Sequence, residues 1–97
     1  MVVRADLPRG LQGAQLIHAA GESVRFRVSP GTHAVCLVVP GERALRELAD
    51  RLERVGVPLV RIVESDAPFT GQLTAIGCEP ARKEVVGRHL SSIPLLR

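Results

Sequence analysis

Two short stretches of the chain contain residue types that bind phosphate or take part in acid–base chemistry. Residues 7–23, LPRGLQGAQLIHAAGES, contain three glycines, two glutamines and a histidine, and residues 64–70, ESDAPFT, contain two carboxylates and two hydroxyls. A carboxylate can orient or deprotonate a water molecule, and a hydroxyl can donate to a developing oxyanion. Loops also carry such residues simply to form turns. Both stretches are therefore candidate sites, and the elements that hold them decide between these interpretations.

The first stretch contains a G-x-x-G pattern, from Gly10 to Gly13, at the start of a predicted helix. Free N–H groups at a helix start bind phosphate, and Arg9 beside the glycines favours the same ligand. The pattern lacks the Lys-Ser/Thr of a Walker loop and the spacing of GxGxxG, so a structural turn is the alternative interpretation. On the first interpretation, Arg9 and Gly10 bind substrate.

Two polar residues of the same helix, Gln15 and His18, are three positions apart and therefore share one face. They form either a catalytic or substrate-orienting pair or an ordinary solvated face. His33 and His89 lie in other elements, and no GxSxG motif is present. The sequence therefore disfavours covalent catalysis.

Hydrophobic periodicity and Pro or Gly breakers divide the chain into seven elements in the order β-α-β-α-β-β-α. The predicted strands are residues 1–7, 32–40, 59–65 and 72–78, and the predicted helices are residues 11–23, 42–56 and 79–93. Residues 24–31 fit either a strand or a continuation of the first helix.

These elements predict an α/β fold built on a mixed four-stranded sheet with helices on both faces. The helical crossovers make the first three strands parallel neighbours, whereas the link from the third strand to the fourth is too short for a crossover and makes the fourth antiparallel. Ligands collect beyond the carboxyl ends of parallel strands. The loops at residues 7–12 and 64–72 should both lie at that edge.

Composition limits the classes of protein that remain. The 97 residues predict one domain, residues 1–97, and the net charge of +3, with twelve Arg against one Lys, gives a modest preference for polyanions such as RNA. Phe26 and Phe69 are the only aromatic residues, which disfavours a reader of unpaired bases. Cys36 and Cys78 lie far apart in apolar stretches and predict buried, reduced thiols without zinc.

Membrane and export signals are absent from the sequence. No apolar run reaches the roughly 18 residues of a membrane helix. The first residues, MVVRADL, lack the basic flank and long apolar core of a signal peptide. We therefore expect a cytoplasmic protein with no membrane partner.

Four segments, taken in order, resemble one known family over nearly the whole chain. These are VVRADL with GAQLIHAA, then THAVCLVVPGERALRELADRLERVGVPLVRIVESDAPFT, then LTAIGCEP, and a last helix followed by PLL. Together they resemble the archaeal and eukaryotic (type 2) family of peptidyl-tRNA hydrolases. The resemblance implies a compact α/β protein, often a homodimer, that hydrolyses the ester between a stalled peptide and tRNA without a metal or other cofactor.

The family pattern transfers to particular residues. The Asp-Ala-x-x-Thr loop of the family matches Asp66 and Thr70, which the resemblance makes catalytic. The strand and helix motifs match Asp6, Gln15 and His18, and the implied partner is tRNA or peptidyl-tRNA.

Two positions depart from the family pattern. The Gly-Lys of the family is Gly10-Leu11 here, so its catalytic cation is absent, and its second catalytic threonine falls on Gln72, which we place among the substrate-binding residues. Loss of a group that stabilises a developing oxyanion costs about 3–4 kcal/mol of transition-state stabilisation. The chain thus resembles a divergent, shortened member in which Arg9 is the nearest substitute cation.

Three functions stay open on the sequence alone. An active peptidyl-tRNA hydrolase would use Asp66 to activate water, Thr70 to stabilise the oxyanion and Arg9 to hold phosphates. A non-catalytic module on the same fold would keep the cleft for tRNA, a nucleotide or a protein. A hydrolase of another small ester or amide would use Asp66 together with His18.

Overall fold

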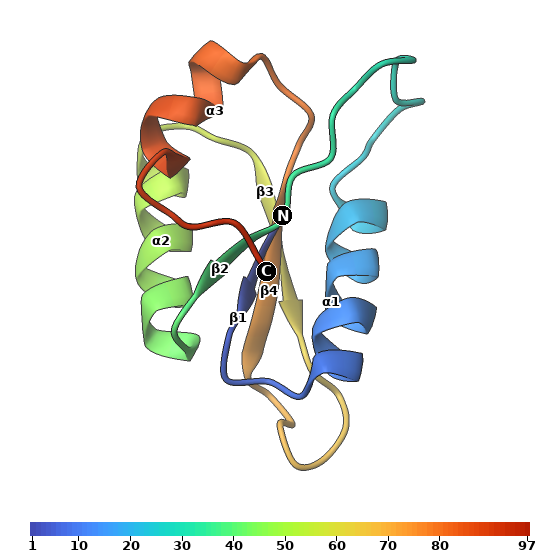
Figure 1. Cartoon of the computed structure of the whole chain (residues 1–97), viewed down its shortest axis with the longest axis vertical. Helices are drawn as coiled ribbons and strands as arrows, with labels where there is room; N and C mark the ends of the chain where they lie inside the picture. Colours follow the sequence, from blue (N-terminus) through green and yellow to red (C-terminus); the bar gives the residue numbers. More distant parts are fainter.

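The computed structural model describes residues 1–97 and contains seven elements in the predicted order. The strands are β1 (Val2–Arg4), β2 (Leu37–Val39), β3 (Leu59–Val63) and β4 (Leu73–Cys78), and the helices are α1 (Arg9–Glu22), α2 (Glu42–Arg54) and α3 (Lys83–Leu90). Figure 1 shows the sheet standing between α1 on one side and α2 with α3 on the other.

The four strands form one mixed sheet in the order β2-β1-β4-β3. Only β1 and β2 pair in parallel, whereas β4 pairs antiparallel with both β1 and β3. The prediction of three neighbouring parallel strands is therefore wrong, because the hairpin after β3 carries β4 into the place between β1 and β3. Since β1 and β3 are both antiparallel to β4, they still end at the same edge, where the residue 64–72 hairpin lies below α1 in Figure 1.

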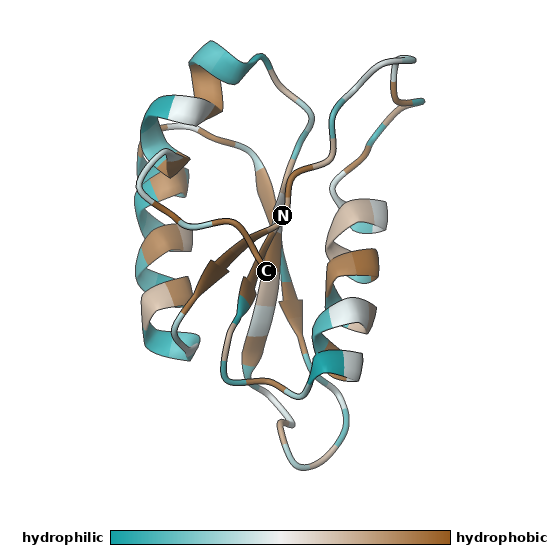
Figure 2. Ribbon diagram, viewed as in Figure 1, coloured by the Kyte–Doolittle hydropathy of each residue, from teal (hydrophilic) through white to brown (hydrophobic).

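Each face of the sheet has its own apolar core, because successive strand residues point to opposite faces. The core on the α1 face, which we call the α1-side core, consists of Val3, Leu7, Ala19, Ile62 and Ala75. The core on the α2 face is larger and includes Val2, Leu45, Leu48, Leu52 and Ile76. Helix α2 is strongly amphipathic, with its hydrophobic residues toward the strands in Figure 2, as its leucine spacing predicts.

Helix α1 lies unusually close to β4 at Gly77. A Cβ atom on Gly77 would stand 2.3 Å from the backbone oxygen of Ala19 and 3.1 Å from the Cβ of Ser23. No side chain fits in that space. The close approach brings the whole of α1 down onto β3 and β4.

Several predicted strands and helices are longer than the corresponding elements of the structure. The predicted strand 32–40 contains only the three residues of β2, and residues 24–36 form an arm without helix or strand that projects beyond α1 in Figure 1. Ser29, Pro30 and Gly31, the last with φ of 84°, place a turn in this arm. The helix predicted to begin near Pro80 begins only at Lys83, because the N–H of Glu79 continues the strand by donating to Pro58 O.

The C-terminal residues pair with the free edge of β2. Val38 N–H donates to Pro94 O at 2.9 Å, and Leu96 N–H donates to Cys36 O at 2.9 Å. The pattern of the sequence contains no signal for this short antiparallel bridge between Leu37 and Leu95.

Candidate functional site

The two candidate stretches of the sequence meet at Glu64. Gln15 Nε2 donates to Glu64 Oε2 at 2.9 Å, although the two residues are 49 positions apart. The other carboxylate oxygen, Oε1, accepts the backbone N–H of Ser65 at 2.8 Å and of Asp66 at 3.2 Å. Gln15 is only 3% exposed, so this contact fixes the start of the hairpin against α1. The sequence leaves the position of Glu64 relative to Asp66 open, and the structure places them together.

Asp66 and Thr70 lie on a closed hairpin. Glu64 N–H donates to Gln72 O at 3.0 Å, and Gly71 N–H donates to Glu64 O at 2.8 Å. Gly71 has a φ of 78°, a conformation that glycine adopts readily and that lets the chain turn back into β4. Both Asp66 and Thr70 are exposed, so a carboxylate and a hydroxyl are available to a ligand on one anchored loop.

A buried arginine supports the base of the hairpin. The Arg4 side chain, 5% exposed, donates to both carboxylate oxygens of Asp6 at 2.8 and 2.9 Å. Its Nη1 also donates to Gln72 Oε1 at 2.9 Å and to Leu73 O at 3.2 Å, and its guanidinium lies 5.8 Å from the Phe69 ring centroid. The hydrogen bond between Arg4 and Asp6 raises the pKa of Arg4 and lowers the pKa of Asp6. Arg4 thus holds Gln72 in place rather than facing a substrate.

A second carboxylate ties the hairpin to the other face of the sheet. Glu42, at the first position of α2, accepts the N–H of Leu73 at 2.6 Å and Arg46 Nη2 at 3.1 Å. The backbone hydrogen bond from Leu73 lowers the pKa of Glu42 below its ordinary value of 4.5. The four-residue spacing of Glu42 and Arg46 indicates only a pair on the helix surface, and no local pattern indicates the contact of Glu42 with β4.

The lowered pKa of Glu42 predicts a specific loss of stability in acid. A carboxyl group with a lowered folded-state pKa stabilises the fold above its unfolded value, and this contribution disappears as the pH falls through the folded value. We expect Glu42→Gln to lower the free energy of unfolding by about 1 kcal/mol at pH 7. The difference from the natural chain should shrink steadily below pH 4.5.

Urea unfolding between pH 7 and pH 2.5 checks this result. Glu47→Gln is the matched control, since Glu47 makes only an exposed ion pair with Arg43 on the same helix. A Glu42→Gln variant that keeps a constant stability difference across this pH range would contradict the role of the charge.

The other predicted site residues take different places. Gly10 and Arg9 lie exposed in the first turn of α1, beside the hairpin end of the sheet. His18 is exposed on α1, with its Nδ1 3.8 Å from the Glu22 carboxylate, and makes no hydrogen bond to the hairpin. Glu79, to which the sequence assigns no role, follows the opposite end of β4 from the hairpin and pairs with Arg25.

Leu11, at the lysine position of the family pattern, is half-buried and packs against the α1-side core. It lies one helical turn before Gln15 and therefore on the same face of α1. The site has no cation at this position.

The chain has two cysteines, Cys36 and Cys78. Both are free thiols that are half-buried rather than fully buried, and burial raises the pKa of Cys78.

The structure contains no group of three His, Cys, Asp or Glu side chains that could hold a metal ion. None of its helices has the length and apolar character needed to cross a membrane.

The fold and the hairpin of residues 64–72 together define an α/β protein in which an anchored Asp-x-x-x-Thr hairpin lies beside the first helix. Residues 1–96 match the family model of peptidyl-tRNA hydrolase PTH2. The chain is also 32% identical over 111 residues to a peptidyl-tRNA hydrolase of Methanopyrus kandleri (strain AV19), a match that covers 100% of this chain and 96% of the relative. The chain belongs to the PTH2 family and is a peptidyl-tRNA hydrolase-like protein.

Proposed function

We propose that this protein hydrolyses the ester bond between a peptide and tRNA at the hairpin edge of the sheet. The observation that supports the proposal is the hydrogen-bonded link from Gln15 through Glu64 to the N–H of Asp66. It joins the two stretches that the family pattern makes functional, although they are far apart in the sequence. Family membership supplies the substrate class.

Asp66 and Thr70 carry the reaction in this proposal. Asp66 accepts a proton from a water molecule as the water oxygen attacks the ester carbonyl carbon. Thr70 donates a hydrogen bond to the oxyanion that forms. The bond to the ribose oxygen of tRNA then breaks, and that oxygen takes up a proton, which releases the peptide acid and free tRNA.

Substrate binding is assigned to the residues around this pair. Arg9 and Gly10 at the start of α1 hold phosphate, and Gln15 and Gln72 line the hairpin base, each already bound to a neighbouring side chain. The predicted catalytic role of His18 stays a prediction, which a His18→Ala variant tests directly.

Release of labelled peptide from purified peptidyl-tRNA is the experiment that tests the proposal. We expect slow but measurable turnover by the natural chain, and Asp66→Asn should lower kcat at least 10-fold because the general base is lost. Asp50→Asn, which removes an exposed aspartate on α2, should leave the rate unchanged. Turnover that is equal in Asp66→Asn and the natural chain would refute the proposed mechanism.

A second candidate function is favoured by one observation, the half-buried leucine at the position of the family lysine. A chain that has lost this cation would act as a tRNA-binding module without turnover. In that case, affinity for tRNA should fall steeply as salt rises, with no peptide released at any protein concentration.

The proposal also includes a cellular location and an oligomeric state. We infer a cytoplasmic location from the family, since peptidyl-tRNA is produced by translation, and a homodimer from the family resemblance. Residues 1–97 act as one unit in this scheme. Light scattering on the purified chain tests the dimer.

A further inference from the structure

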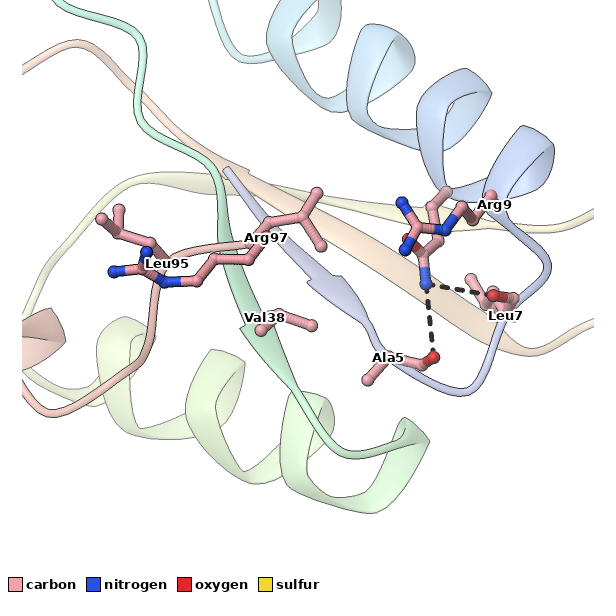
Figure 3. A pocket seen from close by; sticks show the side chains of 8 residues that line it. Ala5, Leu7, Arg9, Val38, Leu95 and Arg97 are labelled. Carbon is pink, nitrogen blue, oxygen red and sulfur yellow. Dashed lines mark hydrogen bonds between the residues drawn. The ribbon is translucent and has the colours of Figure 1, made fainter.

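The three glutamine side chains of the chain differ in whether their amide nitrogen has a partner. Gln12 Nε2 donates to three backbone carbonyl oxygens, and Figure 3 draws the bonds that end on Ala5 and Leu7 as dashed lines. Gln15 Nε2 donates to a carboxylate of the hairpin. The side chain of Gln72 makes its hydrogen bond through the oxygen instead, so its N–H groups are free.

The orientation of the Gln72 amide is fixed by its partner. Arg4 Nη1 lies 2.9 Å from Gln72 Oε1, and a guanidinium group can only donate hydrogen bonds. The atom of Gln72 that faces Arg4 is therefore the carbonyl oxygen, and the amino group points away from Arg4. Gln72 is half-buried, and no buried side-chain nitrogen of the structure lacks a partner, so the free Nε2 is in contact with solvent.

Arg4 itself has little freedom to move. Its side chain is 5% exposed and donates to both carboxylate oxygens of Asp6, and its Nη1 also donates to Leu73 O. A cation that donates to the oxygen of an amide polarises that amide and strengthens its N–H groups as donors. Gln72 Nε2 is thus a fixed and polarised donor without a partner in the protein.

Gln72 lies at the base of the hairpin that carries Asp66 and Thr70. Its backbone oxygen accepts the N–H of Glu64 at 3.0 Å. The carboxylate of Glu64 in turn accepts the N–H of Asp66 at 3.2 Å. One residue, Glu64, therefore links the free amide donor to the exposed carboxylate on the same closed loop.

We propose that Gln72 Nε2 donates a hydrogen bond to the ester carbonyl oxygen as that oxygen becomes an oxyanion, with Arg4 as the positioning residue behind it. The inference rests on the proposed function and adds a second donor beside Thr70. A donor that is already oriented needs no reorganisation when the negative charge develops. Arg4 is buried, and its positive charge acts on the ester through the amide of Gln72.

Two variants of Gln72 test the donor in the release of labelled peptide from peptidyl-tRNA. Gln72→Glu keeps an acceptor for Arg4 but has no N–H group, and Gln72→Met removes the amide without adding a charge. Both should lower kcat at least 10-fold. Gln72→Met should leave KM nearly unchanged, because the hydrogen bond acts in the transition state. A natural kcat in either folded variant would refute the donor.

Gln12→Met is the matched control. It also removes a glutamine amide beside β1, but one whose nitrogen is committed to backbone carbonyls. Its Tm should fall, whereas its kcat should stay that of the natural chain. A merely structural role of Gln72 would make the two methionine variants alike, so an equal change of kcat in both would refute the proposal.

The positioning role of Arg4 predicts that its loss and the loss of Gln72 do not add. Arg4→Met leaves the Gln72 amide free to turn over, while the Asp6 side chain, which is 48% exposed, stays hydrated. This variant should lower kcat, and the double variant Arg4→Met/Gln72→Met should be no slower than Gln72→Met alone. Losses that multiply would contradict the role of Arg4.

A pair of unreactive adenosine analogues tests the donor without turnover. Each carries an N-acetylated amino acid at the 3′ position, one as a carboxamide, which resembles the uncharged ester, and one as a phosphonate monoester, whose anionic oxygen resembles the oxyanion. The natural chain should bind the phosphonate at least 10-fold more tightly than the carboxamide. Gln72→Met should remove most of this preference, and the side-chain amide NMR signal of Gln72 should shift with the phosphonate alone.

These measurements separate the donor from the proposed function. If peptidyl-tRNA is hydrolysed and Gln72→Met keeps both kcat and the preference for the phosphonate, the donor is refuted and hydrolysis stands. If no peptide is released but the preference depends on Gln72, the proposed reaction fails and the donor stands. Absence of both peptide release and preference would refute both.

Discussion

The Leu11→Lys variant should release peptide from peptidyl-tRNA about 100-fold faster than the natural chain. Leu11 lies one turn before Gln15 on the same helix face, and Gln15 binds the carboxylate that holds the N–H of Asp66. An ammonium group at position 11 therefore extends toward the hairpin where negative charge develops. Leu11 is only half-buried, so the lysine stem can cover the same apolar surface while its charged end reaches solvent.

Two control variants isolate the effect of the charge. Ile17→Lys adds the same charge to an exposed position of α1, where Ile17 is 74% exposed, and should change the rate little. Leu11→Met keeps an apolar side chain and should leave the rate unchanged. The expected gain should be in kcat, since a cation that acts on the transition state raises kcat rather than ground-state affinity. A rate that does not rise in Leu11→Lys, with the fold intact by circular dichroism, would contradict a reaction at this hairpin.

Replacing Gly77 by alanine should destabilise the fold by about 3 kcal/mol or more. The new Cβ would lie 2.3 Å from Ala19 O and 2.9 Å from its carbonyl carbon, so α1 must move away from β4 as a unit. Relief by rotation of a side chain is not available, because the nearest atoms belong to the backbone. For a domain of this size we expect the Tm to fall by roughly 12–24 °C.

Gly21→Ala is the matched control for this variant. Gly21 lies near the end of α1 with no atom within 4 Å of an added Cβ, so alanine there should raise stability by about 0.5–1 kcal/mol through its better helix propensity. Thermal unfolding of the two variants should therefore shift in opposite directions. An unchanged Tm in Gly77→Ala would show that α1 and β4 are further apart than described.

Local patterns were sufficient to predict the order of the elements and the meeting of the two candidate stretches. The leucine spacing of residues 42–56 predicts α2, which extends from Glu42 to Arg54. Gln15 and the ESDAPFT stretch follow the first and third strands, and the structure joins them through Glu64. These features depend on residues close together in the sequence or on the general geometry of crossover connections.

Strand order and the supports of the hairpin could not be predicted, because they depend on long-range contacts. β4 inserts between β1 and β3, and its pairing with β1 joins residues more than 70 positions apart along the chain. Arg4 stands in an apolar strand, and its partner Gln72 is 68 positions away. An arginine in such a strand with an aspartate two residues later was the one available signal that a buried charge needs a partner.

Residues 94–96 cover the outer edge of β2, whereas the outer edge of β3 has no strand partner. The outward N–H of Val38 and carbonyl of Cys36 are already occupied, whereas β3 has a strand partner on one side only. Unpaired strand edges invite lateral addition of another chain. Aggregation of partly unfolded molecules should therefore begin along β3, and loss of the last four residues would open a second such edge at β2.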